Sequence, residues 1–193
     1  MSDGKRIKAD VAYPIAGKLM QMLRPHTEWI EVAGSLRRGS PDVGDVEIVA
    51  VPKGDMKPHD VMVETDNLVD LGVIKKAQIP LRKGGTTTRW GSKRRAISFE
   101  EVKFDLFCCD MDNRGLIYWL RTGPDSGKDR GSTTLMTWLK RKRAPFRVEG
   151  GYVKAGGRML SISSESDWFD VLGLPYIPPT DRSASLYNKL FRN

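Results

Sequence analysis

Hydrophobic and polar positions in the first half of the chain alternate between a helical and a strand-like spacing. The stretch from residue 7 to residue 24 has apolar positions at helical spacing, namely Val11, Ile15, Leu19, Met22 and Leu23. It predicts an amphipathic helix that ends near residues 24–25, and a second helix is expected at residues 58–71. Apolar runs bounded by glycine, proline and polar turns predict strands at residues 29–33, 46–51 and 102–109. A polar hairpin is expected at residues 77–90, with a further strand after it.

The pattern changes after residue 112. Helices are predicted at residues 116–121 and 132–143, followed by a β segment at about 148–162. Ser164 then has Asp167 three residues later, which is a carboxylate version of the capping box and predicts the start of another helix. We therefore expect an α+β fold, with a first lobe over residues 1–112 that contains a mixed sheet flanked by helices, and a smaller α+β lobe over residues 113–193.

Charge and composition narrow the class of protein. Lys and Arg outnumber Asp and Glu by 32 to 24, which gives a net charge of +8 and favours polyanionic partners, although a solvated basic surface would look the same. No apolar run approaches the roughly 20 residues that a membrane-spanning helix needs, and no apolar signal-peptide core follows the N-terminus. The adjacent Cys108 and Cys109 suit reduced thiols better than a disulfide. We expect an intracellular, cytoplasmic protein without a membrane partner.

Three carboxylates are the first candidates for chemistry. Asp45 and Glu47 are two residues apart on a predicted strand, so that both project from one face, about 7 Å apart along the backbone. Asp105 lies mid-strand between apolar neighbours, and a cluster of three carboxylates forms if the two strands are adjacent. Such oxygen ligands suit Mg²⁺ or Mn²⁺. The alternatives are a solvent-facing strand at residues 45–47 and a pairing of Asp105 with a buried arginine.

A turn upstream of these carboxylates is suited to binding phosphate. Gly34 and Ser35 follow a strand, where backbone N–H groups and a hydroxyl can approach a phosphate closely. Arg37 and Arg38 are available for charge-assisted contacts, and Gly44 permits close approach beside the first carboxylate. A phosphate-binding turn that leads into a metal pair is an arrangement for phosphoryl transfer.

These residues carry a specific resemblance. Residues 34–39, Gly-Ser-Leu-Arg-Arg-Gly, followed after four residues by Gly-Asp-Val-Glu at 44–47, closely resemble the signature of the X-family DNA polymerases, the group of DNA polymerase beta within the nucleotidyltransferase superfamily. Three further segments are similar to that family: Lys103-Phe104-Asp105-Leu106 to its third-carboxylate strand, Thr122-Gly123 to its sugar-contacting turn, and residues 164–182 to the end of its C-terminal lobe. The similarity spans residues 8–183.

The resemblance implies a function and a set of site residues. Asp45, Glu47 and Asp105 would hold two Mg²⁺ or Mn²⁺ ions, and Asp105 would also orient the primer 3′-hydroxyl. The resemblance places the incoming nucleotide against Gly34, Ser35, Arg38, Gly44, Thr122 and Gly123. The expected protein is a minimal palm and thumb, a monomeric DNA-directed DNA polymerase. It would add a deoxynucleotide from its triphosphate to a primer 3′ end in primed or gapped DNA, and release pyrophosphate.

Basic residues around the predicted hairpin are expected to contact the DNA backbone. They are Lys83, Arg89, Lys93, Arg94, Arg95 and Lys103, the last of which takes the place of a family arginine near the primer terminus. The alternative is a solvated hairpin whose Trp90 packs on the core.

Three departures from the family pattern keep other functions open. Glu47 stands where the polymerases have a second aspartate, Leu120-Arg121 stand where they usually have aromatic residues, and the chain starts too late for the N-terminal lyase and helix-hairpin-helix regions. The alternatives are a template-independent nucleotidyltransferase that acts on a nucleic-acid end or a small acceptor, and a non-catalytic DNA-binding module. Three mutually repelling carboxylates argue against the module, because a site without a cation has no use for them.

Overall fold

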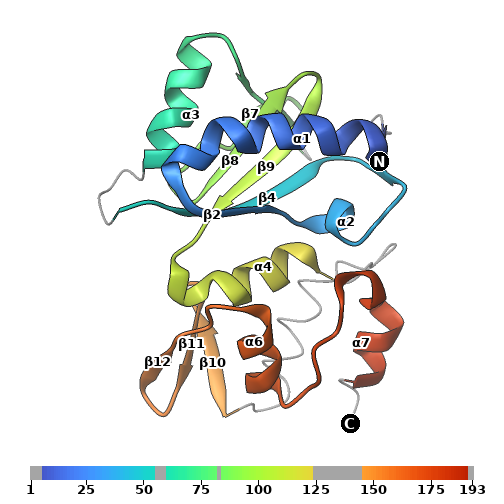
Figure 1. The fold of residues 1–193 in the computed structure, drawn as a ribbon, viewed down its shortest axis with the longest axis vertical. Coiled ribbons are helices and arrows are strands. Elements are labelled where there is room, and N and C mark those ends of the chain that lie inside the picture. The colour runs from blue at the N-terminus through green and yellow to red at the C-terminus, as the bar shows by residue number, and fades with distance from the viewer. Residues whose placement is uncertain (1–5, 55–59, 82–83, 124–144, 191–193) are drawn as a thin grey trace. The chain divides into compact units, whose positions relative to one another are not determined.

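The chain folds into two compact α+β units, Met1–Cys109 and Asp110–Asn193 (Figure 1). The structure is a computed structural model, and it describes residues 6–54, 60–81, 84–123 and 145–190. The expected α+β class is confirmed, and the observed division after Cys109 lies close to the expected one after residue 112. No helix among the described residues combines the length and the hydropathy that crossing a bilayer requires.

A five-stranded mixed sheet forms the centre of the first unit. Its strand order is β2-β4-β9-β8-β5, and its members are β2 (Thr27–Val32), β4 (Val46–Pro52), β5 (Lys75–Lys76), β8 (Arg94–Phe99) and β9 (Val102–Cys108). The strands β4 and β9 run parallel, whereas the pairs β2–β4, β8–β9 and β5–β8 are antiparallel. The three strands expected from the apolar runs are therefore confirmed to within a few residues. The two cysteines are buried free thiols, as expected.

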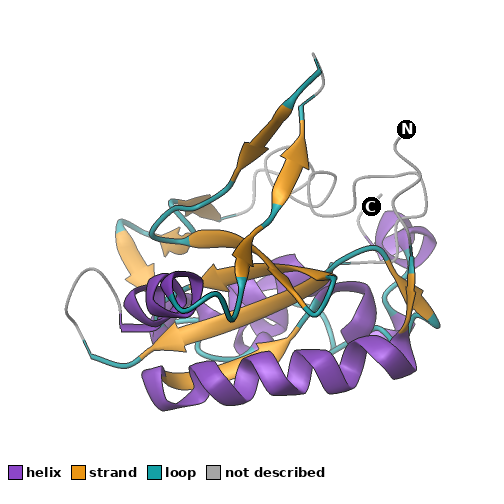
Figure 2. Ribbon diagram, turned by 90° about the horizontal axis from the view of Figure 1, so that it is seen from above, coloured by secondary structure: helices purple, strands orange, loops and turns teal. Residues whose placement is uncertain are grey.

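Helices α1 (Ala9–Leu23) and α3 (Asp60–Asp70) lie on one face of this sheet (Figure 2). The hairpin of β6 (Gln78–Pro80) and β7 (Thr86–Thr88) projects from the other face. The side of α1 that packs into the core carries Ala12, Ala16, Leu19 and Leu23, which recur at helical spacing. Val11, expected on the buried side, is half exposed. The expected burial of Leu19 and Leu23 is confirmed, and the difference is confined to the first half of the helix, where Ala12 and Ala16 face the core.

Short elements complete the first unit, among them the one-turn helix α2 (Gly34–Arg37). The short strands β1 (Ile7–Lys8) and β3 (Asp42–Val43) pair antiparallel, and Arg6 binds both the side chain and the backbone carbonyl of Asp42. The 3₁₀ turn η1 (Arg24–His26) leads from α1 into β2. The expected hairpin consists of β6 (Gln78–Pro80) and β7 (Thr86–Thr88), and its tip at residues 82–83 lies outside the described residues.

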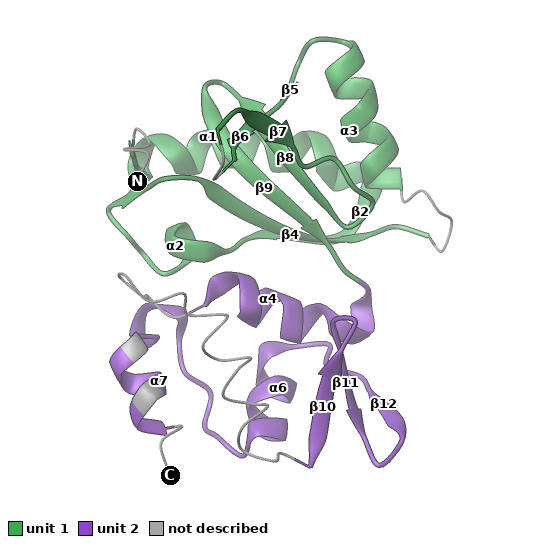
Figure 3. Ribbon diagram, turned by 180° about the vertical axis from the view of Figure 1, so that it is seen from behind, with its two compact units in different colours: residues 1–109 green, residues 110–193 purple. Residues whose placement is uncertain are grey.

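In the residues that the structure describes, the second unit packs helices with a small antiparallel sheet (Figure 3). Its elements are η2 (Met111–Asn113), α4 (Arg114–Thr122), β10 (Phe146–Glu149), β11 (Tyr152–Ala155), β12 (Arg158–Leu160), α6 (Glu165–Leu172), η3 (Pro179–Asp181) and α7 (Ala184–Leu190). The predicted cap of α6 is confirmed, since Ser164 Oγ accepts from the Asp167 N–H at 3.1 Å and Asp167 Oδ2 accepts from the Ser164 N–H at 2.8 Å. The helix expected at residues 132–143 lies outside the described residues, and α7 was not expected.

Aromatic side chains fill the core of the second unit. Trp119 from α4 and Trp168 from α6 are fully buried, with ring centroids 5.4 Å apart in an edge-on arrangement. The indole N–H of Trp119 donates to the hydroxyl of Tyr187 at 3.0 Å, which ties α7 to the other two helices. These contacts explain why the short helix α7 belongs to the folded unit.

Candidate active site

The pairing of β4 with β9 places two of the predicted acidic residues at opposite positions on adjacent strands. In the parallel register Glu47 lies opposite Asp105, and Asp45 comes directly before β4. Val46 and Phe104 are buried in the core under the helices. Because successive strand residues point to opposite faces, Glu47 and Asp105 project from the other face of the sheet. The expectation that the two strands are neighbours is confirmed.

A cavity of about 280 Å³ opens on this face of the sheet. Asp45 and Asp105 lie on its wall, with Arg89 and Lys103, and residues 77–80 close it on the side of the hairpin. The cavity therefore has two acids and two bases among its lining residues, which suits a ligand that carries both phosphate groups and a metal cation.

The charge environment of Asp45 favours a bound cation. Partial loss of hydration raises the pKa of Asp45, although the residue keeps contact with solvent, and the nearby Asp105 carboxylate raises this pKa further. The positive charges of Arg94 and Lys103 act in the opposite direction. A divalent ion between the two carboxylates would relieve their repulsion in the way that the arginine and lysine do in part.

Asp105 forms an ion pair with Arg94 of the neighbouring strand. The guanidinium Nε donates to Asp105 Oδ1 at 3.2 Å and Nη2 donates to Oδ2 at 2.5 Å, so that the pair is bidentate. The same guanidinium lies over the ring of Phe107, 4.8 Å from its centroid. The alternative that Asp105 pairs with an arginine is therefore what the structure shows, although Arg94 is partly exposed and not buried.

Glu47 points toward the phosphate-binding turn and not toward the other two carboxylates. A Cβ atom placed on Gly34 would collide with the Glu47 carboxylate, so this side chain lies directly against the backbone of α2. Within the described parts of the chain, no three His, Cys, Asp or Glu side chains are arranged to hold a metal ion. In this structure the three carboxylates are not grouped as expected, because Glu47 lies against Gly34 and Arg94 pairs with Asp105. Their roles as metal ligands stay predictions.

The turn predicted to bind phosphate forms the short helix α2. The backbone of Gly34 has a φ of +65°, and the Ala33 N–H donates to the Glu47 carbonyl at 2.7 Å, which fixes the turn to the start of β4. Ser35 and Arg38 are half-buried on this turn. The first N–H groups of a helix have no partner inside it and can bind an anion. Gly44 lines the cavity, and a side chain there would meet no atom of the protein within 4 Å.

We expect Gly34→Ala to destabilise the protein more than Gly72→Ala. Both glycines have positive φ values, +65° and +71°, so both substitutions carry the cost of about 1–2 kcal/mol for a left-handed residue. Only the new Cβ at position 34 meets another side chain, that of Glu47. Urea unfolding of the two variants measures the difference, and equal losses would show that Glu47 does not lie against the turn.

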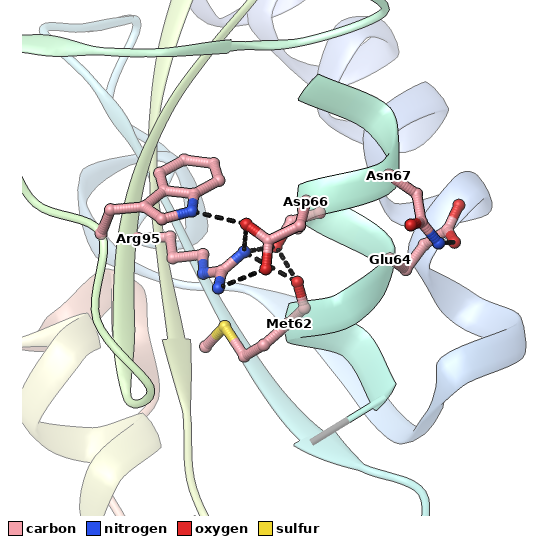
Figure 4. Close-up of polar contacts among 7 residues, drawn as sticks. Met62, Glu64, Asp66, Asn67 and Arg95 are labelled. Carbon is pink, nitrogen blue, oxygen red and sulfur yellow. Dashed lines mark hydrogen bonds and ion pairs between the residues drawn. The ribbon is translucent and has the colours of Figure 1, made fainter. Parts of the chain in front are cut away.

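Arg95 is a structural residue, which corrects the prediction that it contacts DNA (Figure 4). Its guanidinium donates to the Met62 carbonyl at 2.7 Å and to Thr65 Oγ1 at 2.6 Å, and pairs with Asp66 at 2.8 Å. It also lies over Trp90, 4.5 Å from the ring centroid. The strand alternation explains the difference from Arg94, because Arg95 points to the helix side of the sheet.

Arg95→Ala is expected to lower the free energy of unfolding by about 1–3 kcal/mol, since it removes the buried donor of the Thr65 hydroxyl and one of the donors of the Met62 carbonyl. Arg89→Ala removes the same charge from an exposed position and should change stability by less than about 0.5 kcal/mol. Chemical unfolding of both variants is the measurement. A similar small change for both would contradict the anchoring role of Arg95.

The remaining predicted site residues divide by exposure. Lys93 and Lys103 are exposed, as is Arg89, so these three cations can meet a polyanion, whereas Lys83 lies outside the described residues. Trp90 packs against the core, which agrees with the alternative interpretation of the hairpin. Its indole N–H donates to Asp66 at 2.7 Å.

Thr122 and Gly123, predicted to line the sugar and base, end helix α4. Thr122 is fully buried and Gly123 has a φ of +58° at the helix end. A buried threonine side chain has a packing role in this structure, so it does not present itself to a nucleotide.

The sequence allowed a pairing of Asp105 with an arginine but did not identify Arg94 as that partner. The residues two positions apart on antiparallel strands can interact diagonally across one face of a sheet. Arg94 lies opposite Phe107, and Ala96 lies opposite Asp105, so Arg94 is the diagonal neighbour of the carboxylate. The turn at residues 100–101 sets the register of the β8–β9 hairpin, and this register is what could have identified Arg94 as the partner of Asp105.

The comparisons with known proteins bear on the second unit. Residues 126–183 match the family described as the DNA polymerase beta thumb, and residues 145–183 of that match lie in the described part of the chain. No curated protein matches the chain. The match covers the C-terminal unit and leaves the unit with the carboxylates unmatched. The second unit of this chain is therefore similar to the thumb of the DNA polymerase beta family.

Proposed function

We propose that this protein is a metal-dependent nucleotidyltransferase, and specifically a small DNA-directed DNA polymerase that extends a primer 3′ end. The observation that carries the proposal is the parallel register of β4 and β9, with Asp45 and Asp105 on the wall of a cavity that also has Arg89 and Lys103. Acidic metal ligands beside basic groups are what phosphoryl transfer from a nucleoside triphosphate requires. The similarity of the second unit to a polymerase thumb supports DNA as the partner.

Asp45 and Asp105 fit a divalent cation by the chemistry of their donors. Mg²⁺ is usually held by one or two carboxylates and completes its shell with water and substrate phosphates, so two carboxylates suffice without Glu47. Mg²⁺ or Mn²⁺, with two ions as the resemblance implies, would supply charge stabilisation on the transferred phosphoryl group. Asp45 and Asp105 would hold this charge in place on two adjacent strands.

The neighbouring residues would bind and orient the substrates. The backbone and hydroxyl groups of Gly34 and Ser35, with the Arg38 guanidinium, would hold the triphosphate in a fixed position. Lys103, on the same strand as Asp105, would neutralise phosphates near the primer end, with Arg89 on the hairpin side of the cavity. The chain would thus accelerate the reaction by positioning and by electrostatics.

Primer extension on DNA with a one-nucleotide gap tests the proposal. With Mg²⁺ or Mn²⁺ we expect incorporation of the nucleotide complementary to the template, release of pyrophosphate, and loss of both on chelation. Equal use of all four nucleotides, or extension of a single strand, would favour a template-independent transferase, which the Glu47 departure permits. Gap binding without incorporation under either metal would favour a non-catalytic DNA-binding module and overturn the proposal.

A further inference from the structure

Arg94 differs from the other arginine on its strand in how firmly it is held. The Arg95 guanidinium donates to Met62 and Thr65 and pairs with Asp66, and the Arg95 side chain is 8 % exposed. The Arg94 side chain, by contrast, is 35 % exposed. The guanidinium of Arg94 donates two hydrogen bonds, both to Asp105, and lies over the ring of Phe107. Movement of Arg94 into solvent would therefore break its contacts with Asp105 and Phe107, whereas Arg95 would have to leave a buried position.

The bidentate pair engages both oxygens of Asp105. A carboxylate offers about four lone-pair sites, and a forked arginine takes one on each oxygen. The Asp105 side chain is 14 % exposed, so little of its surface is left for another ligand. A divalent cation that shares Asp105 with the nearby Asp45 would also experience repulsion from the guanidinium charge.

We propose that Arg94 is the resident counter-ion of Asp105, and that a divalent cation must displace it from at least one carboxylate oxygen in order to bind. The inference rests on the proposed function, because it assumes that Asp105 is a metal ligand. It makes Arg94 a positioning residue with two effects. The arginine keeps the Asp105 carboxylate oriented toward the cavity side of the sheet, and it sets the affinity of the site for metal.

Titration of the full chain with Mn²⁺ by calorimetry, after treatment with chelator, tests the inference. Arg94→Met keeps an unbranched side chain over Phe107 but removes the charge and both donors, and we expect it to bind Mn²⁺ roughly threefold to tenfold more tightly than the parent. Lys93→Met removes one positive charge from the adjacent exposed position and controls for net charge alone, so that its affinity should change by less. Arg94→Lys retains the charge without the fork and should lie between the parent and Arg94→Met.

The outcomes separate this inference from the proposed function. If the parent binds Mn²⁺ and extends primers, but Arg94→Met binds Mn²⁺ no more tightly than Lys93→Met, the counter-ion role is wrong and the polymerase proposal stands. Weaker binding by Arg94→Met would also overturn the role, because it would mean that the arginine assists the metal. A parent that neither binds Mn²⁺ nor extends primers overturns both. Thermal unfolding of each variant in the presence of chelator verifies that the protein being titrated is folded. If Arg94→Met does not fold, Arg94→Lys provides the test.

Discussion

Asp105→Asn is expected to lower the rate of templated primer extension by about a thousandfold or more, with little change in the fold. The asparagine keeps the size of the side chain and one oxygen that can accept from Arg94, but it loses the charge that would hold a divalent ion. Stabilisation of developing charge by such an ion amounts to several kcal/mol, and each 1.36 kcal/mol corresponds to a tenfold change in rate. Single-turnover extension of gapped DNA measures the effect without interference from product release.

The control for this substitution is Asp70→Asn. Asp70 ends helix α3, is exposed, and belongs to a helix on the opposite face of the sheet from Asp105. It should leave the rate within about twofold of the parent, since exposed charges far from a site act weakly through salt and solvent. An Asp105→Asn enzyme that extends primers as fast as Asp70→Asn would show that Asp105 does not take part in the reaction.

Arg182→Ala is expected to destabilise the second unit by about 3–5 kcal/mol. The Arg182 side chain is fully buried and pairs with the equally buried Glu165 at 2.7 Å, and its Nε donates to the Ile177 carbonyl at 2.9 Å. Removal of the arginine would leave the Glu165 carboxylate buried without its cation, which is the costly way to break such a pair. Because Trp119 and Trp168 are in this core, fluorescence during urea unfolding reports the loss.

A matched control comes from an exposed pair in the same unit. Lys154 binds Glu149 at 3.0 Å, with side chains 46 % and 69 % exposed. Lys154→Ala should therefore cost less than about 1 kcal/mol. If Arg182→Ala and Lys154→Ala lose similar amounts of stability, the buried pair does not hold α6 to the segment that follows it. The result bears on the second unit alone and is independent of any enzymatic activity.

The positions of the three carboxylates on their strands could be predicted from sequence. The period of two places Asp45 and Glu47 on one face, and the apolar neighbours of Asp105 identify its strand. The two strands were expected to be neighbours, and β4 and β9 do pair. Backbone placement is predictable here because each strand has one apolar face that must be buried.

The side-chain arrangement within the site could not be predicted in the same way. The direction of Glu47 depends on contact with Gly34, a residue on another element, and the different roles of Arg94 and Arg95 depend on the exact start of β8. A shift of one residue in that strand would exchange the two arginines between faces. Thr122 illustrates the same limit, since the local Thr-Gly pattern does not reveal that its side chain is fully buried.

The most direct test of the account is to locate a metal ion by its anomalous X-ray scattering. Crystals of the chain with gapped DNA, Mn²⁺ and a non-hydrolysable deoxynucleoside triphosphate would supply the data. We predict a manganese peak bound to Asp45 and Asp105, with the triphosphate against the turn at Gly34 and Ser35 and with Arg94 moved away from at least one Asp105 oxygen. A nucleotide bound elsewhere, or manganese absent from both carboxylates, would contradict the proposal that this sheet face carries out nucleotidyl transfer.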